Sequence, residues 1–442
     1  MKQSPKYKKL IIAFLLLVAA GMFAFIAHSL NEVTWLTGND RIIYYTVIFV
    51  IAVLVFIADG RYTIPELAVI TAMLAGLMLI RICLLYMITW DYKDFLNPWV
   101  EEMRGLSARE AISGYKGNYN LPYIYLIFLI SRYSGYDLMI IKAFSSLFDV
   151  VLAYYVMKCV SLKYHGKYMQ AAAFVLTLAI PTVFYNSSAW GQCDAVYVAF
   201  CIGMLYYGIS GQSKKAVIAW TLGFAFKLQS VFALPIMLLL MTKKKIKWKD
   251  MIFIPITYFI IMIPALLCGK SFMSCLSVYY NQLGDVSVLS CGAQNIWLLV
   301  KDAPFPPYNK LAVYLAGTAT VFFTGICYVK RDRLDTDNMI HAFLCISLLL
   351  PFLLPQMHDR YFYMADIASL LYFFYDRKKF YVPLIVVYSS FNSYRNYLNI
   401  GDFGKDVYIS FVLLFLIAKL INDLFIKLKP LPEPETKGAM NP

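Results

Sequence analysis

Residues 67–90 read LAVITAMLAGLMLIRICLLYMITW, and residues 91–103 continue as DYKDFLNPWVEEM. The first stretch is an apolar run of helical length, and the hydrocarbon core of a bilayer needs about 20 such residues per crossing. Similar runs recur along the chain. Because a helix satisfies its own backbone hydrogen bonds in lipid, they predict an all-α, polytopic membrane protein. No alternating pattern of ~10 residues indicates a membrane barrel.

The overall composition excludes a soluble fold of this size. Of the 442 residues, 61% are hydrophobic and only 15% are charged, and the mean hydropathy is +0.64. The net charge of +14 lies mainly in short connections between apolar runs, as expected for cytoplasmic loops, and does not indicate a nucleic-acid partner. The nine cysteines lack metal-ligand spacing, although Cys275 and Cys291 share a predicted outer loop and could form a disulfide.

Twelve membrane spans are expected. The first is read as an uncleaved span because its apolar run, about 20 residues, exceeds the core of a signal peptide. The expected spans are residues 10–30, 42–58, 67–90, 137–160, 170–187, 195–210, 252–268, 310–329, 339–355, 361–376, 380–397 and 405–426.

Two further apolar segments are ambiguous. Residues 119–134 either cross the membrane or lie along its outer surface, and residues 216–241 either cross or form a broken hairpin. If both cross, five lysines between 158 and 215 lie outside, which opposes the positive-inside rule. We therefore predict a surface segment and a membrane hairpin, with both termini in the cytoplasm.

The chain divides into four regions and has no soluble domain. Residues 1–66 form two additional N-terminal spans, and residues 67–268 form the catalytic core with an outer loop at 91–136. Residues 269–429 contain a second outer loop and the C-terminal spans. Residues 430–442, which are rich in proline, are expected to be a disordered tail.

The loop after residue 90 combines acids with apolar residues at helical spacing. Residues 94–103 predict an amphipathic helix on the outer surface, and Ser107 with Glu110 predicts a capping box for a second short helix. Asp91 either caps the first of these helices or lies at the floor of an outer cavity, where it can accept a proton from a hydroxyl.

The predicted topology brings three more polar segments to the same face. They are WGQCD at 190–194, the hairpin tip at Lys227 and Gln229, and HDRY at 358–361. Each has a simpler structural explanation: Asp194 as a helix cap, Lys227 extending its amine to water, and Arg360 as an interfacial anchor. Arg81, Lys142 and Asp149 lie within spans, where pairing between helices is the simpler expectation.

Five motifs, in the same order, resemble those of the GT-C class of integral-membrane glycosyltransferases. DYKDFLNPW at 91–99 is similar to the D-Y-x-x-F-L-x-P-W stretch of bacterial members, and NYNLPY at 118–123 resembles N-Y-N-P-P-Y with leucine replacing the first proline. WGQCD at 190–194 and FKLQ at 226–229 resemble W-G-Q-x-D and F-K-x-Q. MHDRYF at 357–362 resembles M-H-E-R-Y-F, with aspartate replacing glutamate. The resemblance covers roughly residues 67–376.

This resemblance implies an inverting transfer of a hexose-type sugar from an undecaprenyl-phosphate donor to a glycan or lipid hydroxyl, on the outer face of a bacterial plasma membrane. Asp91 would be the catalytic base, with Asp94 as the second choice. Lys227, His358 and Arg360 would bind the donor phosphate, because cations stabilise the charge developing on a leaving phosphate. The expected substrate-binding residues are Asp194, Gln192, Trp190, Tyr119 and Gln229. No metal is required, although Asp91 and Asp194 could hold a divalent cation.

Two other functions remain open. Twelve spans also suit a transporter or a flippase of lipid-linked sugars, although such proteins usually concentrate polar groups at the membrane midplane. A polymerase or ligase of surface polysaccharide would combine many spans with the large outer loop at 269–309 and would use a diphosphate-linked donor.

Overall fold

The computed structural model describes residues 5–33, 39–133, 135–282, 287–400 and 406–428, and most of these residues are helical. The predicted tail at 430–442 lies outside the described residues. The α-helices are α1 (Pro5–Val33), α2 (Asn39–Asp59), α3 (Ile64–Cys83), α4 (Asn97–Met103), α5 (Ala108–Gly114), α6 (Leu121–Ile130), α7 (Asp137–Ser161), α8 (Lys167–Ala179), α9 (Pro181–Phe184), α10 (Asp194–Ile209), α11 (Ser213–Phe226), α12 (Leu234–Thr242), α13 (Phe253–Leu267), α14 (Phe272–Asn281), α15 (Phe305–Val329), α16 (Thr336–Leu353), α17 (Tyr363–Tyr375), α18 (Tyr381–Leu398) and α19 (Asp406–Lys427).

Shorter elements connect these helices. Two π-helical segments are η1 (Tyr92–Leu96) and η2 (Tyr185–Trp190). The 3₁₀ segments are η3 (Leu228–Ala233), η4 (Trp248–Ile252), η5 (Ile296–Val300), η6 (Arg331–Arg333) and η7 (Arg377–Lys379). The strands β1 (Ser290–Cys291) and β2 (Met357–His358) pair in parallel. This pairing fixes the long loop between α14 and α15 to the connection between α16 and α17.

Several helices are long and apolar enough to cross a bilayer, which indicates a membrane protein. Among the described residues, seven meet that standard, or eight if the pair α8 and α9–η2, bent by 55°, counts as one span. The predicted helical class is confirmed, but the number of about twelve spans is not. The helix α10 has 16 residues and α17 has 13, which corresponds to about 24 and 20 Å of helix against a core of about 30 Å.

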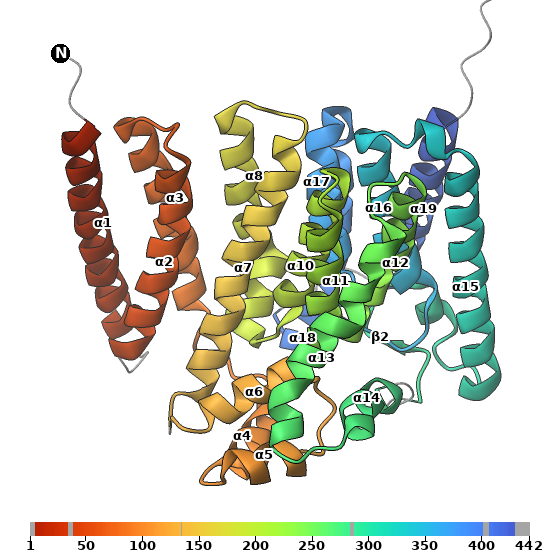
Figure 1. Cartoon of the computed structure of the whole chain (residues 1–442), viewed down its shortest axis with the longest axis horizontal. Helices are drawn as coiled ribbons and strands as arrows, with labels where there is room; N and C mark the ends of the chain where they lie inside the picture. Colours follow the sequence, from red (N-terminus) through yellow and green to blue (C-terminus); the bar gives the residue numbers. More distant parts are fainter. Residues whose placement is uncertain (1–4, 34–38, 134, 283–286, 401–405, 429–442) are drawn as a thin grey trace, which may run out of the picture.

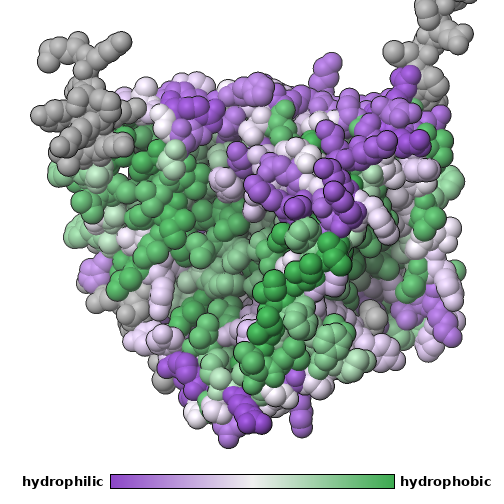
Figure 2. All heavy atoms as spheres, viewed as in Figure 1, coloured by the Kyte–Doolittle hydropathy of each residue, from purple (hydrophilic) through white to green (hydrophobic). Residues whose placement is uncertain are grey.

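The helices form a slab with one strongly hydrophilic edge. Figure 1 shows that α1 begins, and α19 ends, at the upper edge, where the connection between α7 and α8 also lies. The helices α4, α5 and α6 lie at the lower edge. A hydrophilic band follows the upper edge above a broad hydrophobic belt (Figure 2). The arrangement agrees with the topology in which lysine-rich connections share one face.

The two ambiguous segments have distinct structures. The helix α6 has ten residues, about 15 Å of helix, which is too short to cross. Residues 216–241 are interrupted at Lys227, whose backbone is extended (φ −153°, ψ 131°) between α11 and η3. The amide of Lys247, beyond α12, donates to the hydroxyl of Ser213 at the start of α11 at 2.8 Å. The two ends of the broken segment therefore meet, and the segment is a hairpin with Lys227 at the interruption.

Other local predictions have mixed outcomes. Residues 94–103 are helical, but the first part is the π-helical η1 and the second is α4. The capping box is confirmed: the hydroxyl of Ser107 accepts from the amide of Glu110, whose carboxylate accepts from the amide of Ser107. Cys275 and Cys291 are both free thiols, so the suggested disulfide is wrong; Cys275 is instead buried in the apolar cluster around α4–α6 and α13.

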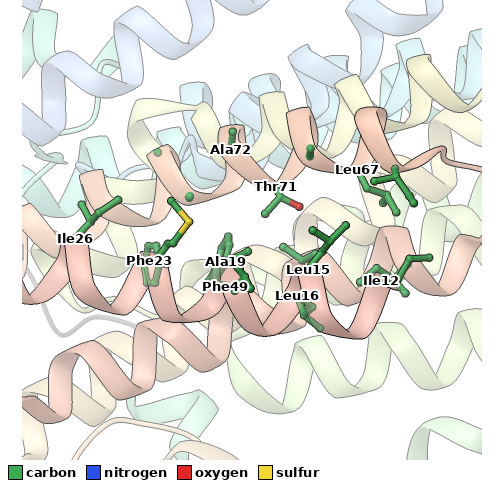
Figure 3. Close-up of a pocket in the computed structure, with 18 of the residues that line it drawn as sticks. Ile12, Leu15, Leu16, Ala19, Phe23, Ile26, Phe49, Leu67, Thr71 and Ala72 are labelled. Carbon is green, nitrogen blue, oxygen red and sulfur yellow. The ribbon is translucent and has the colours of Figure 1, made fainter. Parts of the chain in front are cut away.

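The N-terminal helices pack against the core through α3 and α7. An almost wholly apolar cavity of about 570 Å³ remains between α1, α2 and α3. Figure 3 shows Ile12, Leu16, Phe23, Phe49 and Thr71 among its lining residues. Its lining contains no charged side chain.

Three of the ionisable residues within the spans, Arg81, Asp149 and Lys142, have identified partners. Arg81 Nη2 lies 3.2 Å from Asp149 Oδ2, and both side chains are fully buried. Asp149 Oδ2 also accepts from Ser187 Oγ at 2.6 Å. Lys142 instead donates to the carbonyls of Leu85 and Met87 at 3.0 and 2.6 Å. Structural pairing is thus confirmed for Arg81 and Asp149, whereas Lys142 binds backbone oxygens that follow α3.

Replacing Asp149 by alanine should strongly destabilise the protein, because it leaves a buried guanidinium without its counter-charge. Loss of one partner of a buried pair costs about 3–5 kcal/mol, so thermal unfolding in detergent should shift clearly downward. The Arg81→Met/Asp149→Leu double variant should recover part of this loss, because neither charge is then buried alone.

The matched control for this experiment is Glu66→Gln, which removes the acid of the partly exposed Glu66–Lys167 pair. An exposed pair contributes little to stability. Equal shifts for Asp149→Ala and Glu66→Gln would show that the buried pair is not important for the fold.

Candidate functional site

A cluster of charged side chains forms where η1, η2, α10, α11 and the loop after β2 meet. Asp91 Oδ2 accepts hydrogen bonds from Trp190 Nε1 at 2.8 Å and Gln192 Nε2 at 2.7 Å. Arg360 Nη1 lies 3.5 Å from the same oxygen. Asp91 makes no side-chain capping bond, so the simple explanation of a helix cap does not account for it.

Asp194 forms the second anionic centre of the cluster. Its Oδ1 is paired with Lys227 Nζ, and its Oδ2 accepts from Asn186 Nδ2 at 2.9 Å. Arg360 Nε lies 3.4 Å from the same Oδ2. Arg360 therefore bridges the two carboxylates, and Asp194 pairs with cations instead of capping α10.

Access to solvent differs between the two carboxylates. The side chain of Asp91 is 16% exposed, and those of Arg360 and Lys227 are 13% and 12% exposed. Asp194 is fully buried. Of the two acids, only Asp91 is accessible to solvent.

Gly191 makes the geometry around Asp91 possible. It ends η2 in the left-handed conformation (φ 77°, ψ 27°), which glycine adopts without strain. The amide of Gln192 then donates to the carbonyl of Asn186 at 2.9 Å. The turn directs the side chains on both sides of Gly191, those of Trp190 and Gln192, to one oxygen of Asp91.

Aromatic rings enclose the cluster. The indole of Trp190 stacks on Tyr397 with 4.0 Å between ring centroids, and Tyr397 Oη accepts from the amide of Asp91 at 3.1 Å. The guanidinium carbon of Arg360 lies 5.3 Å from the centroid of Trp190. Lys227 Nζ lies 5.8 Å from that of Tyr361. These rings hold the cations in place through contacts of the cation–π type.

The loop after β2 is packed tightly and has unusual ionisation properties. Burial raises the pKa of Asp359 from 3.8 to about 7. Burial, and then the nearby charges of Arg360 and Lys227, lower the pKa of His358 to about 4. Burial alone would lower the pKa of Arg360, but the carboxylates of Asp194 and Asp91 raise it above its ordinary value. Arg360 is therefore charged at neutral pH, whereas His358 is not.

The other predicted site residues lie at different distances from this centre. Tyr119 stacks on Tyr123 with ring centroids 4.4 Å apart. Burial raises the pKa of the Tyr119 hydroxyl, and the charges of Arg360 and Asp91 make smaller contributions to it. The side chain of Gln229 lies near the hydroxyl of Tyr361, and His358 packs edge-on against Tyr361 with ring centroids 5.2 Å apart. Asp94 is exposed on η1 and takes no part in the hydrogen bonds of the cluster.

From the sequence, a cation is expected at His358, and a metal could bind between Asp91 and Asp194. The structure gives a neutral imidazole, because burial opposes its protonation. Arg360 itself lies between the two carboxylates. Within the described ranges, no group of three or more His, Cys, Asp or Glu side chains is arranged to hold a metal ion.

Sequence reasoning missed Asn186 and the tyrosines of α18. Asn186 donates to both Asp194 and Tyr394 Oη, the latter at 3.0 Å. A signal was present: residues 389–397 read SSFNSYRNY, which is too polar for a lipid-facing helix. They lie within the expected span at 380–397, whose polar residues indicate a face turned toward the protein.

The chain has no match among family models, and no curated protein matches it significantly.

Removing the carboxyl of Asp359 should change how stability depends on pH. The pKa of Asp359 is higher in the folded protein than its ordinary value of 3.8. Its contribution to stability is therefore complete below pH ~4 and lost as pH rises through ~7. Asp359→Asn should consequently gain thermal stability relative to the parent protein between pH 5 and pH 8, as measured by unfolding in detergent.

The lowered pKa of His358 makes stability rise with pH, opposite to the effect of Asp359. His358 is present in both the parent and Asp359→Asn, so the difference between their curves of stability against pH isolates the contribution of Asp359. Glu102→Gln, a change at an exposed acid of the first loop, serves as the control and should follow the parent. Parallel curves for Asp359→Asn and the parent would contradict the raised pKa.

Proposed function

We propose that this protein is an inverting glycosyltransferase. It would transfer a hexose-type sugar from an undecaprenyl-phosphate donor to a hydroxyl of a cell-envelope glycan or lipid, on the outer face of a bacterial plasma membrane. The observation that carries the proposal is the bridge formed by Arg360 between Asp91 and Asp194. It joins three of the segments that resemble motifs of the GT-C class. The proposed topology keeps twelve crossings.

Asp91 is the proposed base. It is the more exposed of the two bridged carboxylates, and its contacts with Trp190, Gln192 and Arg360 are all made by Oδ2. We assign Oδ1 to the acceptor hydroxyl. A carboxylate whose orientation is fixed by hydrogen bonds can accept the proton as the hydroxyl oxygen attacks.

Lys227 and Arg360 are the proposed phosphate ligands. A monophosphate diester carries one negative charge, and a second develops on the leaving phosphate as the bond to the sugar breaks. Two cations held close to that charge, with little water between, stabilise the transition state and lower the activation barrier of the transfer. In the resting structure both cations are paired with carboxylates, so a donor phosphate must compete with Asp194 for them.

The proposed transfer is a single displacement, and inversion is its expected stereochemical outcome. The base and the phosphate ligands belong to different segments, and a single in-line displacement leaves the new bond on the opposite face of the sugar. Tyr119, Trp190 and Gln229 remain the proposed contacts to the sugar or the acceptor. No step in this scheme routes through a metal.

One observation favours a transporter as the second candidate. The helices α8 and α9–η2 are bent by 55° at a break, and the chain is broken again at Lys227. Discontinuous helices are typical of transporters, but there they surround a site near the midplane and occur in matched halves.

Asp91→Asn should abolish sugar transfer, because the amide keeps a similar shape but cannot accept the proton. We expect at least about a 10²-fold lower rate in proteoliposomes supplied with undecaprenyl-phosphate hexoses, and a correctly inserted, folded protein. Glu102→Gln should keep the parental rate, and Asp94→Asn distinguishes between Asp94 of η1 and Asp91, which directly precedes η1.

Unaltered transfer by Asp91→Asn would remove the catalytic assignment. Loss of transfer only in Asp94→Asn would move the base to that residue. Translocation of a lipid-linked sugar without any transfer would instead support the transporter.

The lipid phosphate of the donor should be a monophosphate. If the acceptor is withheld from Asp91→Asn membranes, donor should remain bound, and mass spectrometry of the co-purified lipid identifies its phosphate. A diphosphate-linked oligosaccharide in the same position would support the polysaccharide polymerase or ligase.

A further inference from the structure

The N-terminal helices α1 and α2 precede the segments that resemble a glycosyltransferase, and the proposed reaction uses none of their residues. One polar side chain nevertheless connects α2 to the site. Tyr45, fully buried on α2, shares hydrogen bonds with Ser146 Oγ of α7 at 2.8 Å and Ser188 Oγ of η2 at 3.2 Å. Ser146 and Ser188 are 3.1 Å apart, so the three hydroxyls form a closed triangle.

The π-helical segment η2 is held on two sides by adjacent serines. Ser187 donates to Asp149, the partner of Arg81, at 2.6 Å. Ser188 contacts Tyr45. Two residues later, Trp190 donates to Asp91 at 2.8 Å. A π-helical turn is less stable than an α-helical one and is often found at functional sites, so external contacts must maintain its geometry.

The N-terminal helices contact their neighbours mainly through apolar side chains. The apolar cavity between α1, α2 and α3 (Figure 3) lies on the side of α2 and α3 that faces α1. Apolar contacts can slide, whereas a hydrogen-bonded triangle in a low-dielectric interior fixes position, because breaking it leaves unpaired polar groups.

We propose that Tyr45 is a positioning residue: through Ser188 it holds η2 so that the indole of Trp190 meets the carboxylate of Asp91. This inference rests on the proposed function for its effect on transfer, but its effect on η2 can be measured separately. It gives the N-terminal helices a role as the outer support of the site.

The test compares Tyr45→Phe with Tyr62→Phe. Phenylalanine keeps the buried ring of Tyr45 and removes only its hydroxyl. Tyr62 is also buried in the same apolar cluster, but its hydroxyl donates to the carbonyl of Lys167 at 2.9 Å, at the start of α8. Tyr45→Phe therefore loses the hydrogen bonds to Ser146 and Ser188, whereas Tyr62→Phe loses one bond to the start of α8. Only the first variant loses a contact to η2.

In Tyr45→Phe we expect kcat to fall about tenfold while KM stays within about twofold, because a displaced catalytic group slows chemistry more than binding. Backbone amides of residues 185–192 should exchange hydrogen faster in Tyr45→Phe than in Tyr62→Phe. Tyr45→Ser, which restores a hydroxyl without the ring, should not rescue kcat, because the hydroxyl no longer reaches η2.

The exchange measurement separates the two hypotheses. Faster exchange at 185–192 with no transferase activity in any variant supports the positioning role and overturns the proposed function. Parental exchange and parental kcat in Tyr45→Phe, together with loss of transfer in Asp91→Asn, overturn the positioning role and leave the function intact. A fall in kcat matched by Tyr62→Phe shows general destabilisation and also overturns it.

Discussion

The position of Arg360 between two carboxylates is the constraint on which the site depends. Asp91 and Asp194 lie on segments separated by about a hundred residues, and each would be costly to bury alone. The guanidinium contacts both, and Lys227 supplies the second positive charge. Two acids and two cations therefore balance while His358 stays neutral. The balance lets a highly polar group exist at the end of an apolar bundle.

A balanced cluster also determines how a charged ligand can bind. An anion that enters must take at least one cation from a carboxylate, and the carboxylate must then find another partner or a proton. Asp194 has an alternative partner in Asn186, and Asp91 keeps its bonds from Trp190 and Gln192. Neutral donors can thus support both acids when the cations turn to a phosphate. This arrangement favours a ligand with few negative charges, because each additional one needs another cation.

The sequence could predict the composition of the site better than the shape of the membrane domain. Asp91, Asp194, Lys227 and Arg360 are recognisable because charges are rare in apolar surroundings, and their cost implies a shared environment. Asn186 and Tyr397 were missed because their contacts depend on the π-helical geometry of η2 and the register of α18, which periodicity does not reveal. The count of spans was unreliable for a similar reason: hydropathy measures length, whereas α10 and α17 are short and buried among other helices.

The breaks in the helices explain why some buried polar residues are structural. Every interrupted helix in lipid exposes backbone groups that need partners. Beyond the end of α3, Lys142 donates hydrogen bonds to the carbonyls of Leu85 and Met87. After η2, the carbonyl of Trp190 accepts from Thr89 at 3.4 Å.

Lys142 and Thr89 thus donate hydrogen bonds to backbone carbonyls near Asp91. This structural role needs no catalytic explanation. The interruptions after α3 and at the end of η2 lie close to Asp91 and Trp190. The same interruptions that shorten the helices therefore bring the carboxylate and its donors together.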